Sequence, residues 1–415
     1  MDWLTEEQIV RFMEKYNYDV RKTHNARWID QKCTPDVLCI IADCILEFDK
    51  ICVTEWFSSL DVWHNTYTTE NVEAIFKKPN PDEKKARNEY DKFFQQPMEL
   101  FSNAGILWKK KDGKRNLYKI WNKKLLEYIS IGEMNALKFL NLYNTKVLKD
   151  SGIYKYYDEF FTNPTPNTFN KMKSEFVRFT LTNTPIQTPI ECNRIFTKIL
   201  NPIAFIKNSV GTKGGYISKE KITKDVLMYN RTNFRDIYAN KPKEMTRKEY
   251  YDTLKQKPNI NLIKYQMVKA KKLLRDYNDT FRKGLSEVND ALSNDVPATH
   301  IHHIFPANEF EEISNYIENL IALTPGQHYS EAHPNANTRI IDKSFQQICL
   351  LAKSNNIEEN IKYSRKIIYS FDNFAYILSV GLEENQFLEV DDMDFIELVR
   401  LINMKFISSE SSELV

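Results

Sequence analysis

Histidines gather in one short segment of this chain. Five of the seven histidines in its 415 residues lie between Thr299 and Asn337. They are His300, His302, His303, His328 and His333. A neutral imidazole can accept a proton from water near neutral pH, and it can also bind a divalent metal ion. The segment therefore offers both a general base and metal ligands, which are the groups that hydrolysis of a phosphodiester bond needs.

Short apolar runs in the same segment predict the elements that position these histidines. The alternating, β-branched stretch 299–304 predicts a strand that ends before Pro306, and the apolar run 319–323 predicts a second strand. Thr324 and Pro325 suit the N-cap and the first position of a helix, and a later proline would stop that helix. We therefore predict the order strand, loop, strand, helix.

Each requirement of the hydrolysis has a candidate residue in this unit. His303 is the candidate general base, and Asn319 is the candidate that holds the loop so that His303 faces the water. His302 and His328 are candidate metal ligands. His300 shares a strand face with His302, and we expect it to face solvent or to support a ligand.

These residues resemble the HNH, or ββα-metal, nuclease motif: His302-His303, then Asn319, then His328 nine residues later. The His-His opening and the Thr-Pro-x-x-His helix start are similar to the colicin-type DNases. The sequence pattern HHIFP…ENLIALTPGQH…AHPNANT resembles HNH-type type II restriction endonucleases more closely. The resemblance implies hydrolysis of double-stranded DNA to 5′-phosphate and 3′-hydroxyl ends, with one Mg²⁺ or Mn²⁺ ion per active site. It also implies a homodimer when both strands are cut, and a cognate DNA methyltransferase in the same restriction system.

The position of His333 departs from that resemblance. Colicin-type enzymes place another metal-binding histidine four residues after the first one of the helix, where this chain has Ala332. Five residues turn about 140° around an α-helix, so we expect His333 to bind the metal only if the helix unwinds before Pro334. It is a candidate third metal ligand or phosphate contact. The sequence lacks the CxxC pairs that hold zinc in many HNH domains, so no structural zinc is expected.

A basic hairpin is predicted between residues 106 and 120, with Asp112-Gly113 at its turn. Its candidate DNA contacts are Lys109, Lys110, Lys111, Lys114 and Arg115. With the preceding helices it resembles a winged helix, which implies that a helix enters the major groove while the hairpin follows the DNA backbone. The alternative is an exposed hairpin whose charges are only solvated. Pro97 is expected to break the helix before the hairpin, and Pro202 is expected to end a later helix.

Three further groups are candidate DNA contacts. They are Lys213 in a glycine-rich turn, then Arg231, Asn233 and Arg235, and then Lys271, Lys272 and Arg275 on a basic helix that leads into the nuclease unit. For the last group, a solvated helix face is an equal alternative.

The composition is that of an ordinary globular protein. Its 58 basic and 56 acidic residues leave a near-neutral chain, which does not exclude DNA binding because the distribution of charge matters more than the sum. No stretch is long and apolar enough to span a membrane, and the N-terminus lacks the features of a secretion signal. The six cysteines show no metal or disulfide spacing, so we expect reduced thiols in a cytoplasmic protein.

We therefore predict a helix-rich α+β protein of several domains. The predicted parts are a winged-helix-like DNA-recognition domain (1–150), a helical middle region with DNA-contacting loops (151–285), an HNH nuclease unit (286–345) and a C-terminal helical region that packs on it (346–415). The expected activity is site-specific DNA cleavage. The alternatives are a nicking or homing HNH nuclease, and a DNA-binding regulator without catalysis.

Overall fold

The structure is a computed structural model of the whole chain. It describes residues 4–26, 28–52, 54–83, 86, 91–229, 242, 245, 260–289, 295–333, 341–364 and 366–413. Two compact units make up the chain: residues 6–257 form the first unit, and residues 1–5 with 258–415 form the second. Helices dominate both units, and the named strands of the described residues form three separate two-stranded antiparallel sheets. The prediction of a helix-rich α+β protein is confirmed at this level.

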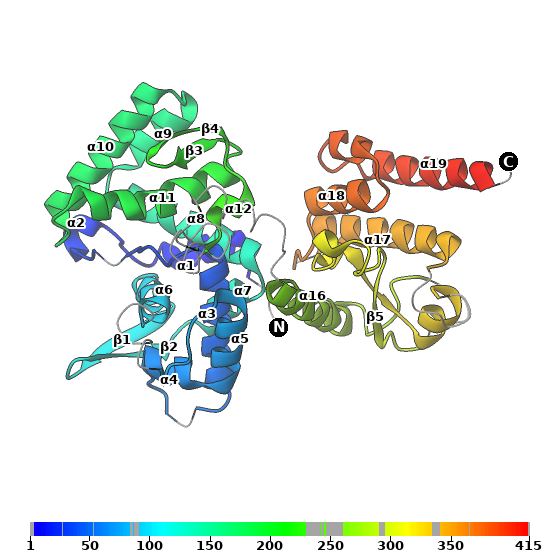
Figure 1. Cartoon of the computed structure of the whole chain (residues 1–415), viewed down its shortest axis with the longest axis horizontal. Helices are drawn as coiled ribbons and strands as arrows, with labels where there is room; N and C mark the ends of the chain where they lie inside the picture. The colour runs from blue at the N-terminus through cyan, green and yellow to red at the C-terminus, as the bar shows by residue number, and fades with distance from the viewer. Residues whose placement is uncertain are drawn as a thin grey trace. The chain divides into compact units, whose positions relative to one another are not determined.

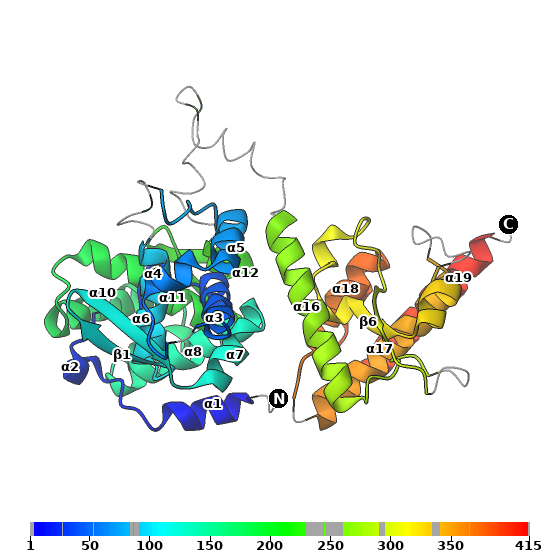
Figure 2. The ribbon, with the colours of Figure 1, turned by 90° about the horizontal axis from the view of Figure 1, so that it is seen from below.

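The first unit is built around one buried helix, α3 (Pro35–Asp49). Every residue from Pro35 to Leu46 is buried, because apolar side chains are spread around the whole helix. The helices that pack against it (Figure 2) include α5 (Thr66–Phe76), α6 (Asp91–Asn103), α7 (Lys123–Ser130) and α8 (Glu133–Asp150). The other helices that the structure describes in this unit are α1 (Glu6–Met13), α2 (Val20–Thr23), α4 (Ser59–His64), α9 (Tyr154–Thr162), α10 (Pro166–Asn183), α11 (Pro189–Ile206) and α12 (Lys224–Leu227).

Both prolines that were expected to interrupt helices lie inside continuous ones. Pro97 is in the middle of α6 and Pro202 lies near the end of α11, so those two predictions are wrong. A proline inside a helix costs about 3 kcal/mol, because it removes a hydrogen bond and clashes with a carbonyl. Here both prolines are buried in apolar surroundings, and burial of neighbours such as Phe94 and Phe101 offsets that cost.

Two hairpins belong to the first unit. Strand β1 (Leu107–Asp112) pairs with β2 (Arg115–Ile120) and ends where Asp112 faces Arg115, which confirms the predicted hairpin and its Asp-Gly turn. Gly113 has a φ of +58°, a conformation that glycine adopts without strain. Strand β3 (Val210–Lys213) pairs with β4 (Tyr216–Lys221).

The second unit wraps a strand pair with helices. Its elements are α16 (Ile260–Phe281), β5 (His300–His303), η1 (Glu311–Ile313), η2 (Ile317–Asn319), β6 (Leu320–Leu323), η3 (Gln327–Glu331), α17 (Lys343–Tyr363), α18 (Phe371–Gly381), η5 (Asn385–Glu389) and α19 (Phe395–Glu413). One hydrophobic core runs from Ala270 on α16 through the buried strand β6 to Phe406 on α19. Figure 2 shows α16 beside β6 and α17. Within the described residues, no helix combines the length and the apolar composition needed to cross a bilayer.

Candidate metal centre

Strands β5 and β6 carry the first histidines. They pair antiparallel with His302 opposite Ile321 and His303 opposite Leu320, which confirms both predicted strands. Because side chains alternate along a strand, His302 and His303 point to opposite sides. The pairing therefore separates the candidate metal ligand from the candidate base.

The turn after β6 starts with a reciprocal cap. The Thr324 hydroxyl accepts a hydrogen bond from the Gln327 amide at 3.2 Å, and the Gln327 side-chain oxygen accepts one from the Thr324 amide at 3.2 Å. The predicted helix start is confirmed. Gln327 was not among the candidate residues, although Thr-x-x-Gln is the capping-box pattern that could have revealed it.

Gln327 also ties this turn to a distant loop. Its side chain is fully buried, accepts a hydrogen bond from the Ser286 hydroxyl at 2.6 Å and donates one to the Val288 carbonyl at 3.2 Å. The start of the turn is therefore held by both its own cap and the loop at 286–288.

The turn that follows is π-helical rather than α-helical. It spans Gln327–Glu331, and the amide of Ala332 donates to the carbonyl of Gln327, five residues earlier, at 2.8 Å. The expectation of 3.6 residues per turn is therefore wrong here. In a π-helical turn the hydrogen bond joins residues i and i+5, so two residues five apart lie near each other on the same side of the turn. His333 therefore lies near His328, with the ring centroids 5.0 Å apart. The five-residue spacing between His328 and His333 is therefore compatible with a shared site, because this turn is wider than an α-helical turn.

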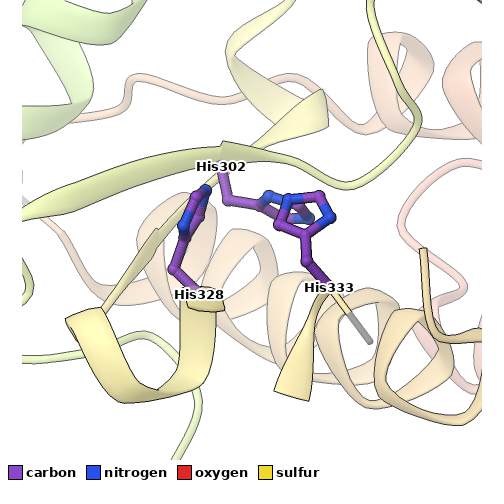
Figure 3. Close-up of side chains that lie close together, drawn as sticks. All are labelled: His302, His328 and His333. Atoms are coloured by element: carbon purple, nitrogen blue, oxygen red, sulfur yellow. The ribbon is translucent and has the colours of Figure 1, made fainter. Parts of the chain in front are cut away.

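Three histidines converge as a result (Figure 3). His302, His328 and His333 each offer a ring nitrogen, and these nitrogens lie within 4.8 Å of one another. The ring centroids are 5.0 Å apart for His302 and His333, 5.0 Å for His328 and His333, and 5.3 Å for His302 and His328. His302 and His333 are buried, whereas His328 is partly exposed. His300 stacks on the His328 ring with the ring centroids 4.8 Å apart, so it borders the cluster next to His328.

The charge state of the cluster favours metal binding. Burial, reinforced by the neighbouring histidines, lowers the pKa of His302 to about 3 and the pKa of His328 to about 4. Both rings are therefore neutral at pH 7 and can donate a lone pair. The Nδ1 atom of His328 is buried and has no hydrogen-bond partner among the described residues. A bound cation would satisfy such a nitrogen, so the residues fit a metal ion.

His303 has different surroundings. Its Nε2 lies 3.1 Å from the carbonyl oxygen of Ser314, which can only accept, so Nε2 carries the proton and Nδ1 is left as an acceptor. Burial and the positive charge of Lys271 lower the pKa of His303 to about 4, although the bond to Ser314 opposes that shift. His303 is therefore a neutral imidazole with one nitrogen free to take a proton.

Asn319 fastens the loop that carries Ser314. It is fully buried; its Oδ1 accepts from the Phe305 amide at 2.9 Å, and its Nδ2 donates to the carbonyls of Phe305 at 3.1 Å and Ile313 at 3.3 Å. Asn319 therefore joins the end of β5 to the residue before Ser314. The predicted role of Asn319, holding the loop so that His303 faces the water, stays a prediction; the structure links Asn319 to the loop whose Ser314 carbonyl bonds to His303.

A buried ion pair between Glu287 and Lys353 holds strand β6 in place through hydrogen bonds to Ala322. Glu287 exchanges backbone and side-chain hydrogen bonds with Ala322, both at 2.9 Å, and its other carboxylate oxygen lies 2.7 Å from the Lys353 ammonium. Both charged side chains are fully buried, and Lys353 also donates to the Tyr369 hydroxyl at 3.0 Å. No local pattern marked Glu287 or Lys353, because their partners are far away in the sequence.

Helix α16 places a cation beside the histidines. Arg275 donates to the carbonyl of Thr299 at 3.2 Å, and Gln266 accepts from Asn315, so the helix is anchored at both ends of the site. Lys271 lies between these anchors, half-buried, and its charge acts on His302, His303 and His328. Lys272 is exposed.

The hairpin cations differ in availability. Lys109 pairs with Glu99 at 2.7 Å, and the Lys110 ammonium lies 4.2 Å from the centre of the Trp56 ring. Lys111, Lys114 and Arg115 are exposed at the tip, and Lys213 is exposed at the end of β3. The candidates Arg231, Asn233 and Arg235 lie outside the described residues.

Comparison with protein-family models, with curated proteins and with solved structures finds no match for this chain.

Proposed function

We propose that this protein is a metal-dependent DNA endonuclease of the HNH, or ββα-metal, type. The observation that carries the proposal is that the histidines have two different kinds of surroundings. Three imidazoles face one another in a group that could hold an ion, while His303 stands apart with its tautomer set by the Ser314 carbonyl. Strand, loop, strand and turn occur in the order that the motif implies. The narrower assignment, a type II restriction endonuclease, rests on the sequence resemblance alone.

The donor set bears on which ion is used. The resemblance implies Mg²⁺ or Mn²⁺, but Mg²⁺ prefers oxygen ligands. Three imidazole nitrogens with a further position open suit Zn²⁺, Ni²⁺ or Co²⁺ better. We propose that His302, His328 and His333 hold one divalent ion of this group. When bound, the ion would stabilise negative charge on the scissile phosphate and on the departing 3′-oxygen.

The chain's own residues supply the proton transfer and part of the charge. His303 accepts a proton from water at Nδ1 while Nε2 stays bound to the Ser314 carbonyl, which stabilises the imidazolium that forms. The resulting hydroxide attacks phosphorus in line with the leaving 3′-oxygen. Lys271 adds a positive charge beside the phosphate, where a partly buried site makes it more effective than a solvated lysine.

The test is cleavage of plasmid DNA by chelator-treated protein to which Mg²⁺, Mn²⁺, Ni²⁺ or Zn²⁺ is restored separately. We expect cleavage with at least one ion and none with chelator. The variant His303→Ala should lower the rate about 10²–10⁴-fold while DNA binding and metal binding remain. His64→Ala, an exposed histidine of the first unit, is the matched control and should cut normally. Undiminished cutting by His303→Ala, or no cutting with any ion, would reject the proposal.

The same digests separate the alternatives. Linear plasmid whose ends share one sequence supports a restriction enzyme, whereas nicked circles alone support a nicking enzyme. DNA binding without cleavage in any metal would support a non-catalytic regulator.

A further inference from the structure

The β1–β2 hairpin has one face fastened to the first unit. Lys109, Asn116 and Tyr118 all bond to the carboxylate of Glu99 on α6, at 2.7, 3.1 and 2.6 Å. Because side chains alternate along a strand, Trp108, Lys110 and Lys119 belong to the opposite face. The hairpin is therefore held at its back by Glu99, while on its front Lys119 pairs with Glu55 at 2.6 Å and Lys110 lies over the Trp56 ring.

Two tryptophans stack on that front. The rings of Trp108 and Trp121 are 3.9 Å apart at their centroids and inclined by 15°, yet their side chains are 45 % and 51 % exposed. Trp108 faces Lys119 in the register, and Trp121 comes two residues later, so the stack is a diagonal cross-strand pair. That pairing explains the contact between the rings, but it leaves a large aromatic surface in water.

The hairpin tip, at least three residues along the strand from Trp108, is cationic, whereas Lys119 opposite Trp108 is already paired with Glu55. Lys111, Lys114 and Arg115 are exposed at the hairpin tip, and among the described residues none of them pairs with an acid. Lys110 already lies over the neighbouring Trp56 ring. A planar aromatic surface on the same hairpin as unneutralised tip cations matches an extended ligand that has planar rings and negative charges in alternation.

We infer that the Trp108–Trp121 stack is a platform for an unpaired nucleobase of single-stranded or locally opened nucleic acid. The base continues the stack on an outer ring face, and the tip cations, about 10 Å or more further along the hairpin, neutralise phosphates further along the strand. Stacking on tryptophan is tolerant of sequence because every base has a π-face. The inference concerns the first unit and does not depend on the metal centre.

The competing occupant is an apolar protein surface, including a second copy of this chain. Such a partner needs apolar area but not a flat ring. Leucine and phenylalanine substitutions therefore distinguish the two, because leucine keeps the apolar character and loses the π-face.

The experiment measures binding by the whole protein with chelator present, so that no DNA is cut. The probes are a labelled oligo-dT and an abasic deoxyribose-phosphate oligomer of the same length. We expect the wild type to bind oligo-dT roughly 5–100-fold more tightly than the abasic oligomer. The double variant Trp108→Leu/Trp121→Leu should lose that preference, and Trp108→Phe/Trp121→Phe should keep most of it.

Lys114→Ala/Arg115→Ala is the matched control for charge. It should weaken binding of both oligomers equally and reduce the dependence on salt. Equal affinity of the wild type for the two oligomers would overturn the inference, as would a leucine variant that keeps the preference. A wild-type dimer that the leucine variant dissociates would assign the surface to self-association and also overturn it. Because no cleavage is measured, failure here is distinguishable from failure of the nuclease proposal.

Discussion

Under the proposed function, His303 and the three clustered histidines take two different roles although they are the same residue type. His303 has one nitrogen committed to the Ser314 carbonyl, so its other nitrogen is set as an acceptor. His302, His328 and His333 face one another, and burial lowers the pKa of the first two far enough to keep them neutral. In this proposal, the surroundings of each ring, and not its residue type, separate the proton acceptor from the metal ligands.

Removing His333 tests the metal centre directly. His333→Ala should weaken Ni²⁺ or Zn²⁺ binding by more than the roughly 10–100-fold that loss of a merely orienting group costs, because one of three nitrogens disappears. His300→Ala, which removes a stacked ring and its contacts with the Tyr329 and Thr299 hydroxyls but no ligand nitrogen of the cluster, should stay within that range. Titration calorimetry on chelator-treated protein measures both. Equal affinities for His333→Ala and wild type would remove His333 from the ligand set.

Adjacent lysines on α16 provide a matched pair of variants. Lys271→Ala should lower the cleavage rate at saturating DNA by roughly 10–100-fold, because it removes a positive charge beside the developing phosphate charge. Lys272→Ala removes the same charge from an exposed position and should change mainly the affinity for DNA and its salt dependence. Single-turnover kinetics at two salt concentrations separates the two effects. If both variants behave alike, Lys271 has no special role in the reaction.

At the scale of elements, the π-helical turn decides the geometry of the site. Its cap is local, since Thr324 and Gln327 bond to each other, but its position depends on Ser286 and Val288. Strand β6 is likewise held from outside, by Glu287 and its buried partner Lys353. Short elements of four or five residues are not stable alone, so these outside bonds keep the histidines in place.

Element η2 contains a buried acid whose titration should be visible in stability. Burial raises the pKa of Glu318 to about 7, despite hydrogen bonds from Ser370 and Asn373 and the charge of Lys353. In the unfolded chain Glu318 loses its proton near pH 4.5, whereas in the folded protein it keeps the proton up to about pH 7. The stability that protonated Glu318 contributes is therefore fully present below pH 4.5 and is lost as the pH rises through 7.

Glu318→Gln has no proton to lose. We compare the free energy of unfolding of this variant with that of wild type. The difference, variant minus wild type, should increase by at most about 3 kcal/mol between pH 4.5 and 7 and stay constant above pH 7. Urea unfolding of metal-free protein at several pH values measures the difference. Glu309→Gln, an exposed acid, should follow wild type throughout. A constant difference between Glu318→Gln and wild type across this range would show that Glu318 is ionised in the folded state.

At the scale of the molecule, all three clustered histidines and His303 belong to the second unit, whereas the basic hairpin belongs to the first. The second unit has its own hydrophobic core, built from α16, the strand pair and the C-terminal helices. Under the proposed function, the chemistry is therefore concentrated in one unit and the hairpin contacts in the other.

A fragment of residues 258–415 tests this separation. Because it contains both the core and the ligand set, it should fold cooperatively and bind Ni²⁺ or Zn²⁺ with nearly the affinity of the whole chain. Its affinity for DNA should be lower and less dependent on salt, because the hairpin cations are missing. Circular dichroism, calorimetry and filter binding provide the readouts. A fragment that is unfolded or metal-free in these assays would show that the first unit is needed to build the site.

Much of the local structure near the site could be predicted from sequence. The two strands, the helix start at Thr324-Pro325 and the Asp-Gly hairpin are each specified by neighbouring residues, through β-branching, capping and turn geometry. The candidate ligands His302 and His328 followed from residue type and order, and the structure brings them together.

Tertiary structure decided what depends on residues distant in the chain. Pro97 and Pro202 stay within helices because buried packing offsets their local cost. His333 joins the cluster because the turn widens by one residue, and Gln327 holds that turn through Ser286 and Val288. Lys353 is buried as a charge only because Glu287 reaches it across the core. Types and spacing along the chain specify which groups are present, whereas long-range packing and hydrogen bonding determine which of them meet.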